Sequence, residues 1–539
     1  MADERCADVL TRRLYDAGCR YAFGMPGGEV LTLIDALERA GIRFVLVKHE
    51  NAGGFMAEGT WHRTGAPGIL VATVGPGAMN GVNSVANADQ DRVPLIVLTG
   101  CIDAAETETY THQVLDHRAV FAPMTRAQFT LSPGAAHVIA DKAVRIATEG
   151  RPGPVHVDVP ISIADAPPGP SPHLPPYSAA LPLAPAPGAG LDAARAALAS
   201  ARRPLVVAGL DAVNEGAAGP IAAFCEAFGA PLITTYKAKG LLPEDHPLAL
   251  GGAELSPKAD KLLLPLVDKA DVVVALGYDP IEMRTGWQDP WDPSRQTVID
   301  IAAAPNRHGM HRASHDILGG CVESLAVLTE GLEPGETWTD GEIAETRSGL
   351  AQAFPENEPW GPGAVIAETR AAMPAGTLAT ADSGAHRILL SQMWRCDEPR
   401  GLMQSSGLCT MGCALPLAMG AKLADPDRAV VAFMGDAGFL MVAGELATAA
   451  ELGIAVIAVV FVDASLALIE MKQRSRQMTN RGVDFSRHDH AAIARAFGGH
   501  GETVRDRTGL RAALNATQGR TGFTLIAAEI DRGAYDGRI

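Results

Sequence analysis

The stretch RAVVAFMGDAGFLM, residues 428–441, predicts a buried strand that leads through a turn of small residues into a helix. Its apolar run ends in Gly435-Asp436-Ala437-Gly438, and the helical pattern GELATAAELG follows. Small residues in such a turn let backbone N–H groups approach an anion, and an Asp at a strand tip suits a hard cation. The alternative for this segment alone is an ordinary glycine-rich turn with a capping Asp.

Apolar runs of the same kind recur along the chain and alternate with Ala/Leu-rich helical patterns. The C-terminal third also contains GTLATAD, IAVIAVVFVD and FTLIAAEID; the N-terminal third contains RFVLVKHE, PGILVATVG and VPLIVLTG; the middle contains RPLVVAGLD, PLITTY, DVVVALGYD and QTVIDI. Continuous runs are typical of strands buried on both faces, and the helices between them make βαβ units. The sequence therefore predicts an α/β protein of three doubly wound parallel-sheet domains.

Two proline-rich regions divide the 539 residues. The first is residues 164–190, and the second comprises EPGETWTDGE, residues 333–342, and FPENEPWGPG, residues 354–363. Proline recurs in the first region too often for a helix or a central strand. We therefore predict domains at residues 1–165, 190–332 and 350–539.

The charge balance and the apolar pattern exclude several classes of protein. There are 45 Lys and Arg against 62 Asp and Glu, a net charge of −17, which predicts no nucleic-acid partner and no anionic membrane surface. The apolar runs, such as residues 454–462, are far shorter than the roughly 20 residues that span a bilayer. The start, MADERCADVL, lacks the apolar core of a secretory signal, and the 8 cysteines have no metal or redox spacing. We expect a cytoplasmic protein.

A second acid follows another strand of the C-terminal third. Asp463 ends IAVIAVVFVD, 27 positions after Asp436, and Ser465 follows it. Adjacent parallel strands would bring the two carboxylates to one edge of the sheet, where they could form part of a Mg²⁺ site. A solvated loop acid is the alternative for Asp463 alone.

The N-terminal third has polar and glycine residues in similar places. Glu50 ends RFVLVKHE and begins a helical pattern of small residues. Gly75-Pro76-Gly77 forms a tight turn after the next strand, with Asn80 behind it. A buried carboxylate after a strand is suited to proton exchange, but helix-start acids and such turns are also common without any catalytic role.

Taken in order, these segments resemble the thiamine diphosphate-dependent enzymes of the acetolactate synthase and pyruvate oxidase type. GMPGG at 24–28 is similar to the family's opening turn, and KHENAGGFMAEG at 48–59 to its glutamate segment. SSGLCTMGCALPLAMGAKLA at 405–424 is similar to a SGGLGTMGFGLPAAMGA-like stretch, and GDAGFLM with VVFVDAS to the cofactor signature. The resemblance covers nearly the whole chain, and it implies pyrimidine-binding, central and diphosphate-binding domains.

The resemblance also implies roles for single residues. Glu50 matches the glutamate that hydrogen-bonds the aminopyrimidine of thiamine diphosphate, and Met411 the apolar residue that holds the cofactor bent. Asp436, Asp463 and Ser465 match the Mg²⁺ ligands. The other matched positions are Gly27, Gly75, Pro76, Asn80, Gly384, His386, Gly435, Ala437 and Gly438 for cofactor binding, and His112 and Gln113 for catalysis near the reacting carbon.

The activity implied is Mg²⁺-dependent decarboxylation of a small-molecule 2-oxo acid followed by carboligation, as in acetolactate synthases. The resemblance further implies a homodimer or homotetramer with active sites between subunits. Some positions depart from the family: Ala437 replaces a glycine, Asp463 an asparagine and His112 a phenylalanine, and residues 468–473 lack a tryptophan. A polar pocket of this kind suits another substrate.

Alternatives therefore stay open. Within the family they are a simple 2-oxo acid decarboxylase and a lyase acting on an acyl-CoA or a sulfonated aldehyde. An alternative of another class is a non-catalytic paralogue used as a binding or assembly subunit. FAD in the central domain is possible but unsupported, because VIDIAAAPNRHG at 298–309 follows the family pattern only as far as Asp300.

Overall fold

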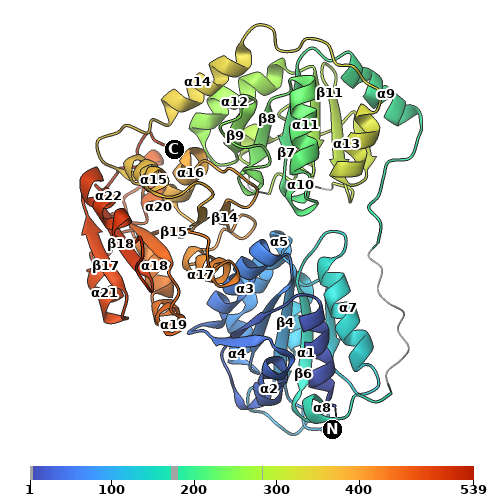
Figure 1. Ribbon diagram of the computed structural model, residues 1–539, viewed down its shortest axis with the longest axis vertical. Helices are drawn as coiled ribbons and strands as arrows, with labels where there is room; N and C mark the ends of the chain where they lie inside the picture. Colours follow the sequence, from blue (N-terminus) through green and yellow to red (C-terminus); the bar gives the residue numbers. More distant parts are fainter. Residues whose placement is uncertain (1–3, 171–179, 282, 307) are drawn as a thin grey trace.

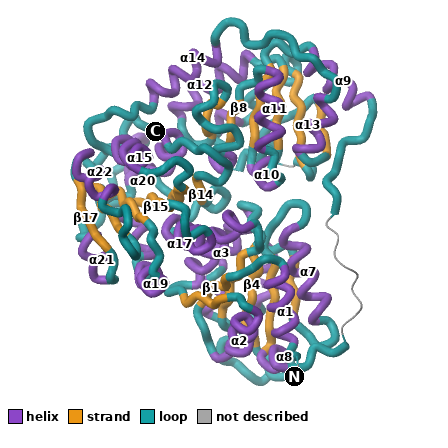
Figure 2. The backbone as a smooth tube through the Cα atoms, viewed as in Figure 1, coloured by secondary structure: helices purple, strands orange, loops and turns teal. Residues whose placement is uncertain are grey.

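Three α/β domains follow one another along the chain, each built on a six-stranded parallel sheet (Figure 1). The computed structural model describes residues 4–170, 180–281, 283–306 and 308–539. Figure 2 shows the strands of each domain side by side between layers of helices. The predicted fold class is confirmed. Residues 171–179 of the predicted proline-rich linker lie outside the described residues.

The N-terminal domain has the strand order β2-β1-β3-β4-β6-β5. Its strands are β1 (Tyr21–Gly24), β2 (Arg43–Leu46), β3 (Gly68–Ala72), β4 (Leu95–Cys101), β5 (Ala127–Thr130) and β6 (Val155–Pro160). Its helices are α1 (Cys6–Asp16), α2 (Leu31–Ala40), α3 (Glu50–Thr64), α4 (Pro76–Asn80), α5 (Val82–Gln90), α6 (His117–Phe121), α7 (Ala136–Thr148) and α8 (Ile161–Asp165), with short 3₁₀ turns η1 (Gly28–Val30) and η2 (Ala122–Met124).

The central domain has the strand order β12-β11-β10-β7-β8-β9, which reverses direction between β7 and β10. Its strands are β7 (Pro204–Ala208), β8 (Leu232–Thr235), β9 (Ala249–Ala253), β10 (Val272–Leu276), β11 (Thr297–Ala302) and β12 (His315–Leu318). Its helices are α9 (Ala189–Ala199), α10 (Leu210–Asn214), α11 (Ala218–Phe228), α12 (Pro257–Lys269) and α13 (Cys321–Thr329), with 3₁₀ turns η3 (Tyr236–Ala238) and η4 (Thr285–Trp287).

The C-terminal domain has the order β14-β13-β15-β16-β18-β17, which repeats the N-terminal order of second, first, third, fourth, sixth and fifth strand. Its strands are β13 (Leu378–Ala381), β14 (Leu402–Gln404), β15 (Val430–Gly435), β16 (Ile457–Val462), β17 (His500–Val504) and β18 (Thr524–Glu529). Helix α14 (Glu342–Ala353) lies against α12 of the central domain and leads into the C-terminal domain. The helices of the C-terminal domain are α15 (Pro362–Ala372), α16 (Ala385–Met393), α17 (Ala414–Ala424), α18 (Asp436–Val442), α19 (Glu445–Leu452), α20 (Ala467–Ser475), α21 (His490–Ala496) and α22 (Arg507–Asn515).

Helices α3 and α17 join the two terminal domains, and they are equivalent in topology because each connects the second strand of its sheet to the third. A Cβ atom at Gly59 would overlap the Leu417 carbonyl oxygen, and one at Gly420 would overlap the Met56 carbonyl oxygen. Each helix thus gives one glycine and one carbonyl, three residues apart, to the other. Glycine at both positions lets the two backbones approach closely.

All three domains meet at Asp91, whose carboxylate is 0% exposed. Lys237 of the central domain donates to Asp91 Oδ2 at 2.6 Å. From the C-terminal domain, the backbone N–H groups of Ser406 and Gly407 donate to the same carboxylate at 3.1 and 2.8 Å. A buried charge is tolerated only when it is paired and hydrogen-bonded, and Asp91 is both.

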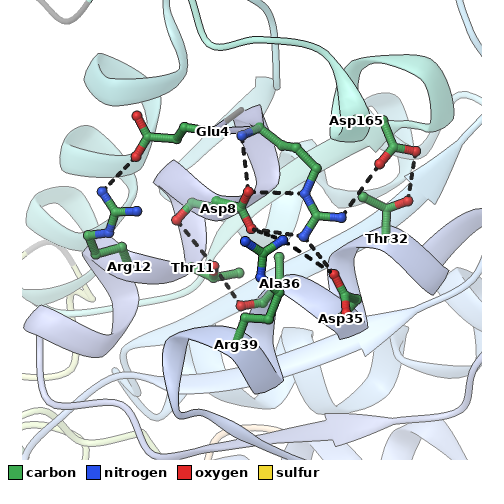
Figure 3. Close-up of polar contacts among 10 residues, drawn as sticks. Glu4, Asp8, Thr11, Arg12, Thr32, Asp35, Ala36, Arg39 and Asp165 are labelled. Atoms are coloured by element: carbon green, nitrogen blue, oxygen red, sulfur yellow. Dashed lines mark hydrogen bonds and ion pairs between the residues drawn. The ribbon is translucent and has the colours of Figure 1, made fainter. Parts of the chain in front are cut away.

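The two ends of the N-terminal domain are also held together by polar contacts (Figure 3). Arg5 pairs with Asp8 on α1 at 2.9 Å and with Asp35 on α2 at 2.7 Å. Thr32 of α2 donates to Asp165, the last residue of α8, at 2.9 Å.

None of the helices in the described part of the chain combines the length and the apolar character that a membrane span requires.

Candidate functional site

A cavity of about 120 Å³ lies at the carboxyl ends of the strands of the C-terminal sheet. Its walls come from the segments that follow β13, β15 and β16, from Met411, from residues 465–469 at the start of α20 and from Tyr535. All the described lining residues lie between residues 383 and 535. Ligands of open α/β sheets bind at this edge, which makes the cavity the candidate site.

Asp436 and Asp463 both line the cavity, as the strand pattern predicts, because β15 and β16 are neighbours in the sheet. Asp436 accepts hydrogen bonds from the backbone N–H groups of Ala437 at 2.9 Å and Ala464 at 2.8 Å. Asp463 accepts from the backbone N–H of Ser465 at 3.2 Å. Burial raises the pKa of Asp436, and burial together with the nearby Asp436 raises the pKa of Asp463 to about 7.

Small residues form the floor of the cavity beside these acids. Gly384 precedes α16, Gly435 and Ala437 flank Asp436, and Gly438 follows one residue later. A Cβ atom at Gly438 would overlap Asp382 Oδ2, so this position has no room for a side chain. Ala437 lies in the first turn of α18 and is not among the residues with positive φ, which explains why alanine is accommodated there.

His386 forms another part of the wall. Its ring stacks on Phe461 with the centroids 5.4 Å apart, and its Nε2 is buried without a hydrogen-bond partner. Burial lowers the pKa of His386 to about 3, so its ring is neutral at physiological pH. The unpartnered nitrogen is therefore available to a ligand in the cavity.

Tyr535 is a residue of this site that the sequence analysis missed. It is buried against the cavity, in the segment that follows β18 after the last ladder bond, from Ile530 N–H to the Val462 carbonyl at 3.1 Å. Burial is the main cause that raises the pKa of Tyr535 well above its usual value, and the nearby Asp463 and Asp436 add to it. No motif in RGAYDGRI marks it, so only the fold identifies its place.

The second group of candidate residues lies in the N-terminal domain and surrounds Glu50, the first residue of α3. The Glu50 carboxylate is 3% exposed and accepts a hydrogen bond from Asn80 Nδ2 at 2.9 Å. A Cβ atom added at Gly77 would lie 3.1 Å from Glu50 Oε1. Helix α4, which begins at Pro76 and ends at Asn80, therefore hydrogen-bonds one carboxylate oxygen and leaves little room beside the other.

Of the other predicted residues of this domain, Gly75 and Gln113 join this group. Gly75 has a φ of +66°, and a Cβ atom there would lie 3.1 Å from Gln113 Cβ. His112 and Gln113 belong to an exposed segment between β4 and α6, where Gln113 has a φ of +59°. Gly27, at the start of η1, lies against Thr73 in the strand-to-turn segment before Gly75.

The structure thus forms two clusters from the predicted residues. One cluster, in the N-terminal domain, comprises Glu50, Gly75, Pro76, Asn80 and Gln113. The other cluster lines the cavity around Asp436 and includes Ser465 and Met411. The described lining of the cavity includes no residue of the first cluster.

Comparison with known proteins covers all three domains. Residues 4–120 match the N-terminal TPP binding domain of thiamine pyrophosphate enzymes, residues 191–328 the central domain and residues 382–528 the C-terminal TPP binding domain. The probable acetolactate synthase large subunit of Methanocaldococcus jannaschii is 30% identical over 86% of this chain and 81% of its own length. The chain belongs to the thiamine pyrophosphate enzyme family.

Other relatives of this thiamine pyrophosphate enzyme are named for two different activities. The acetolactate synthase of Bacillus subtilis is 29% identical over 98% of this chain and 94% of its own length. The probable 2-ketoarginine decarboxylase of Pseudomonas aeruginosa is 30% identical over 96% of this chain and 92% of its own length. The chain is an acetolactate synthase-like thiamine diphosphate-dependent enzyme, and the relatives favour this over the non-catalytic alternative.

The residues of the cavity fit the cofactor of a thiamine pyrophosphate enzyme. Two buried carboxylates with raised pKa values face one space, and no Lys or Arg is among the described lining residues. A divalent cation would compensate their charge, and the floor of small residues leaves room for a diphosphate. No group of three or more His, Cys, Asp and Glu side chains among the described residues could hold a metal alone, so the other oxygen ligands would come from backbone and cofactor.

In the central domain of this thiamine pyrophosphate enzyme, ion pairs occupy the edge of the sheet where a flavin dinucleotide would bind. At the point where its strand order reverses, Asp211 follows β7 and Asp279 follows β10. Arg92 of the N-terminal domain pairs with both, and Arg151 pairs with Asp211 at 3.2 Å. These interdomain ion pairs lie at the edge where a dinucleotide would bind. FAD therefore stays unsupported.

Proposed function

We propose that this enzyme uses thiamine diphosphate and Mg²⁺ to decarboxylate a 2-oxo acid and to join the remaining fragment to a second carbonyl compound. The observation that carries the proposal is the pair Asp436 and Asp463, buried over a floor of small residues in a domain that matches TPP binding domains. Bound thiamine diphosphate supplies the electron sink for cleavage of the carbon–carbon bond.

Residues of the C-terminal domain hold the cofactor in this proposal. Asp436, Asp463 and the Ser465 carbonyl would hold Mg²⁺, and a cation there would compensate the charge of the acid pair and of the diphosphate. Gly384, His386, Gly435, Ala437 and Gly438 surround the diphosphate. Met411 lies on the cavity wall, where its flexible apolar side chain would support the body of the cofactor.

Residues of the N-terminal domain handle the proton. Glu50 holds a proton at its carboxylate and exchanges it with the aminopyrimidine of the cofactor, which requires the two groups to meet in one geometry. Asn80 fixes Oε2, so that Oε1 beside Gly77 is the oxygen left to act. Gly27, Gly75 and Pro76 shape the turn that receives the ring, and His112 and Gln113 face the substrate.

The active site would form between two copies of the chain. The described lining of the Asp436 cavity contains no residue of the N-terminal domain, and this supports a Glu50 donated by a second subunit. Large apolar side chains are exposed beside both clusters: Tyr110, Val114 and Leu115 near Gln113, and Leu440, Met441 and Ile469 near the cavity. Exposed apolar groups of this size favour a subunit contact, so we propose a homodimer or homotetramer.

Mixed subunits test this arrangement. In a hybrid of Glu50→Gln and Asp436→Asn chains, purified by two different tags, one interfacial site keeps both residues while the other lacks both. We therefore expect the hybrid to recover about half of the active sites, while each variant alone is inactive. If every site were built within one chain, no hybrid site would be intact, and an inactive hybrid would contradict the interfacial proposal.

A panel of 2-oxo acids tests the reaction. The loaded enzyme is incubated with each acid, alone and with a second carbonyl compound, and CO₂ and ligated product are measured separately. Ligated product supports the carboligase. CO₂ without it supports the simple decarboxylase, which the 2-ketoarginine decarboxylase relative favours as the second candidate. Acyl-CoA and sulfonated aldehyde substrates in the same panel test the lyase alternative. Absence of CO₂ from every acid would contradict the proposal.

A further inference from the structure

A chain of buried polar side chains lies beneath the turn at Gly75, and the proposed function leaves it without a role. It consists of Thr99 on β4, His117 at the start of α6, and His156 and Asp158 on β6. All four are buried, and the His117 side chain is 0% exposed. Polar groups buried this deeply are costly unless each proton has one acceptor.

The hydrogen bonds determine which nitrogen of His117 carries its proton. The backbone N–H of Gly75 can only donate, and it donates to His117 Nε2 at 3.1 Å. His117 Nε2 is therefore unprotonated, so Nδ1 carries the proton and donates to Asp158 Oδ1 at 3.0 Å. A histidine protonated at Nε2 could not accept from Gly75.

The hydrogen bonds of Thr99 and His156 are also determined by which group can donate. Thr99 donates to Asp158 Oδ1 at 2.6 Å, so the Thr99 oxygen accepts from His156 Nε2 at 2.7 Å. Burial alone would raise the pKa of Asp158, but the hydrogen bonds from His117, His156 and Thr99 outweigh it and hold that pKa well below its usual value. The carboxylate thus stays charged and holds His117 in one orientation.

His117 contacts the proposed catalytic machinery through the hydrogen bond from Gly75. Gly75 precedes α4, and α4 lies against Glu50, with Asn80 donating to Oε2 and with no room for a side chain at Gly77 beside Oε1. A short helix pinned at its first end therefore sets the place of the carboxylate. His117 also ends the exposed segment that carries Gln113, which lies against Gly75.

We propose that His117 is a positioning residue that holds α4, and through it the Glu50 carboxylate, in the geometry that the reaction needs. Asp158 orients His117 in turn. This inference rests on the proposed role of Glu50, but the hydrogen bond between Gly75 and His117 is a property of the cofactor-free protein and is tested there.

Two variants of His117 test the proposal. His117→Phe keeps a buried ring but cannot accept from Gly75, and we expect faster hydrogen exchange at the Gly75 amide of the cofactor-free protein. With the cofactor bound, kcat should fall by about 10- to 100-fold while KM changes by less than about threefold. His117→Gln can accept from Gly75 and donate to Asp158, so it should restore the Gly75 protection and most of the activity.

His156→Phe is the matched control, because it removes a buried imidazole from the same network without touching Gly75. We expect it to lower the thermal midpoint as His117→Phe does and to keep kcat. An equal loss of kcat in the two variants, or unchanged Gly75 exchange in His117→Phe, would overturn the proposal. If His117→Phe does not fold, ¹⁵N NMR of the wild-type imidazole decides, since a proton on Nε2 is incompatible with the inferred hydrogen bond.

The outcomes also separate this inference from the proposed function. Faster Gly75 exchange with reduced kcat in His117→Phe, together with full activity in Glu50→Gln, would remove Glu50 from the mechanism and leave the hydrogen bond intact. Slow Gly75 exchange in His117→Phe with an inactive Glu50→Gln would contradict the hydrogen bond from Gly75 to His117 and leave the role of Glu50 intact. Only the combination of a sensitive Gly75 amide, a reduced kcat in His117→Phe and an inactive Glu50→Gln supports both.

Discussion

Lys237 Nζ lies 2.6 Å from Asp91 Oδ2, and the two side chains join different domains in a place closed to solvent. The same ammonium is 3.9 Å from Glu58 Oε1 on α3. Burial raises the pKa of Glu58 to about 8 despite this cation, while Lys237 is held charged by its two acidic neighbours. One lysine of the central domain therefore compensates the buried charge of Asp91 at the junction.

Replacing this lysine should destabilise the whole chain. Lys237→Met leaves Asp91 buried without its cation, and removing one partner of a buried ion pair costs about 3–5 kcal/mol. Chemical unfolding measures the loss. Lys142→Met, at an exposed position of α7, is the control and should change stability by less than about 0.5 kcal/mol. Recovery of stability in Lys237→Met with Asp91→Asn would assign the loss to the pair, and no recovery would contradict it.

The acid pair of the cavity predicts a pH dependence of the metal-free protein. Asp463 has a folded pKa of about 7 against an ordinary 3.8, so the folded state loses stability as the pH rises from about 4 to about 7. The loss is about 1.4 kcal/mol for each pH unit within that range. Asp463→Asn removes this penalty. We expect the metal-free variant to be more stable than wild type at pH 8 and equally stable at pH 4, by thermal unfolding.

With Mg²⁺ and cofactor bound at pH 8, wild type should become more stable than Asp463→Asn. Wild type should gain stability with added Mg²⁺ and cofactor at pH 8, whereas Asp463→Asn should gain less because it has lost a ligand. A variant that responds to Mg²⁺ as strongly as wild type would remove Asp463 from the metal site.

Glu50→Gln tests the proton exchange. Glutamine keeps the size of the side chain and an oxygen for Asn80, so folding and the thermal midpoint should be unchanged. Turnover should fall by a factor of about 10² or more, the range of general acid–base catalysis. Glu38→Gln, an exposed carboxylate on α2, is the control and should keep full turnover. Near-normal turnover in Glu50→Gln would contradict the assigned role.

Gly438→Ala tests the floor of the cavity. Its Cβ would overlap Asp382 Oδ2, and the other oxygen of Asp382 accepts from the backbone N–H of Cys413 at 2.9 Å, two residues after Met411. The displaced Asp382 should disturb both walls of the cavity. We expect cofactor affinity to fall by about tenfold or more, measured by fluorescence quenching. Ala437→Gly is the control and should bind within about threefold of wild type; equal binding by both variants would contradict this account.

Much of the fold follows from the sequence because central parallel strands are continuously apolar. RAVVAFMGD and IAVIAVVFVD contain β15 and β16. The central strand β6 does not follow from its pattern, since VHVDVP alternates apolar and polar residues as a half-exposed strand does. In the fold His156 and Asp158 are buried all the same, because Thr99 pairs with both side chains and His117 donates to Asp158. That compensation comes from segments far apart in the sequence.

The parts of the candidate site that lie at strand ends could be predicted from the sequence, and the parts that depend on tertiary packing could not. Asp436 and Asp463 meet because strand tips of neighbouring strands share an edge, and Glu50 meets Asn80 because α4 lies against the start of α3. Tyr535 and His117 could not be found, because their places depend on how the C-terminal segment and α6 fold back on the sheets. The domain boundaries at 165, 190, 332 and 350 and the roles of the site residues stay predictions.

The reciprocal glycine contacts between α3 and α17 have the form that a two-fold axis imposes on identical partners. Here the partners are different parts of one chain, and their sheets have the same strand order. An ancestral single domain that paired with its own copy, and whose gene was later duplicated and fused around the central domain, would leave this arrangement. On that history, the proton-exchanging half and the metal-binding half of the enzyme are divergent descendants of one ancestor.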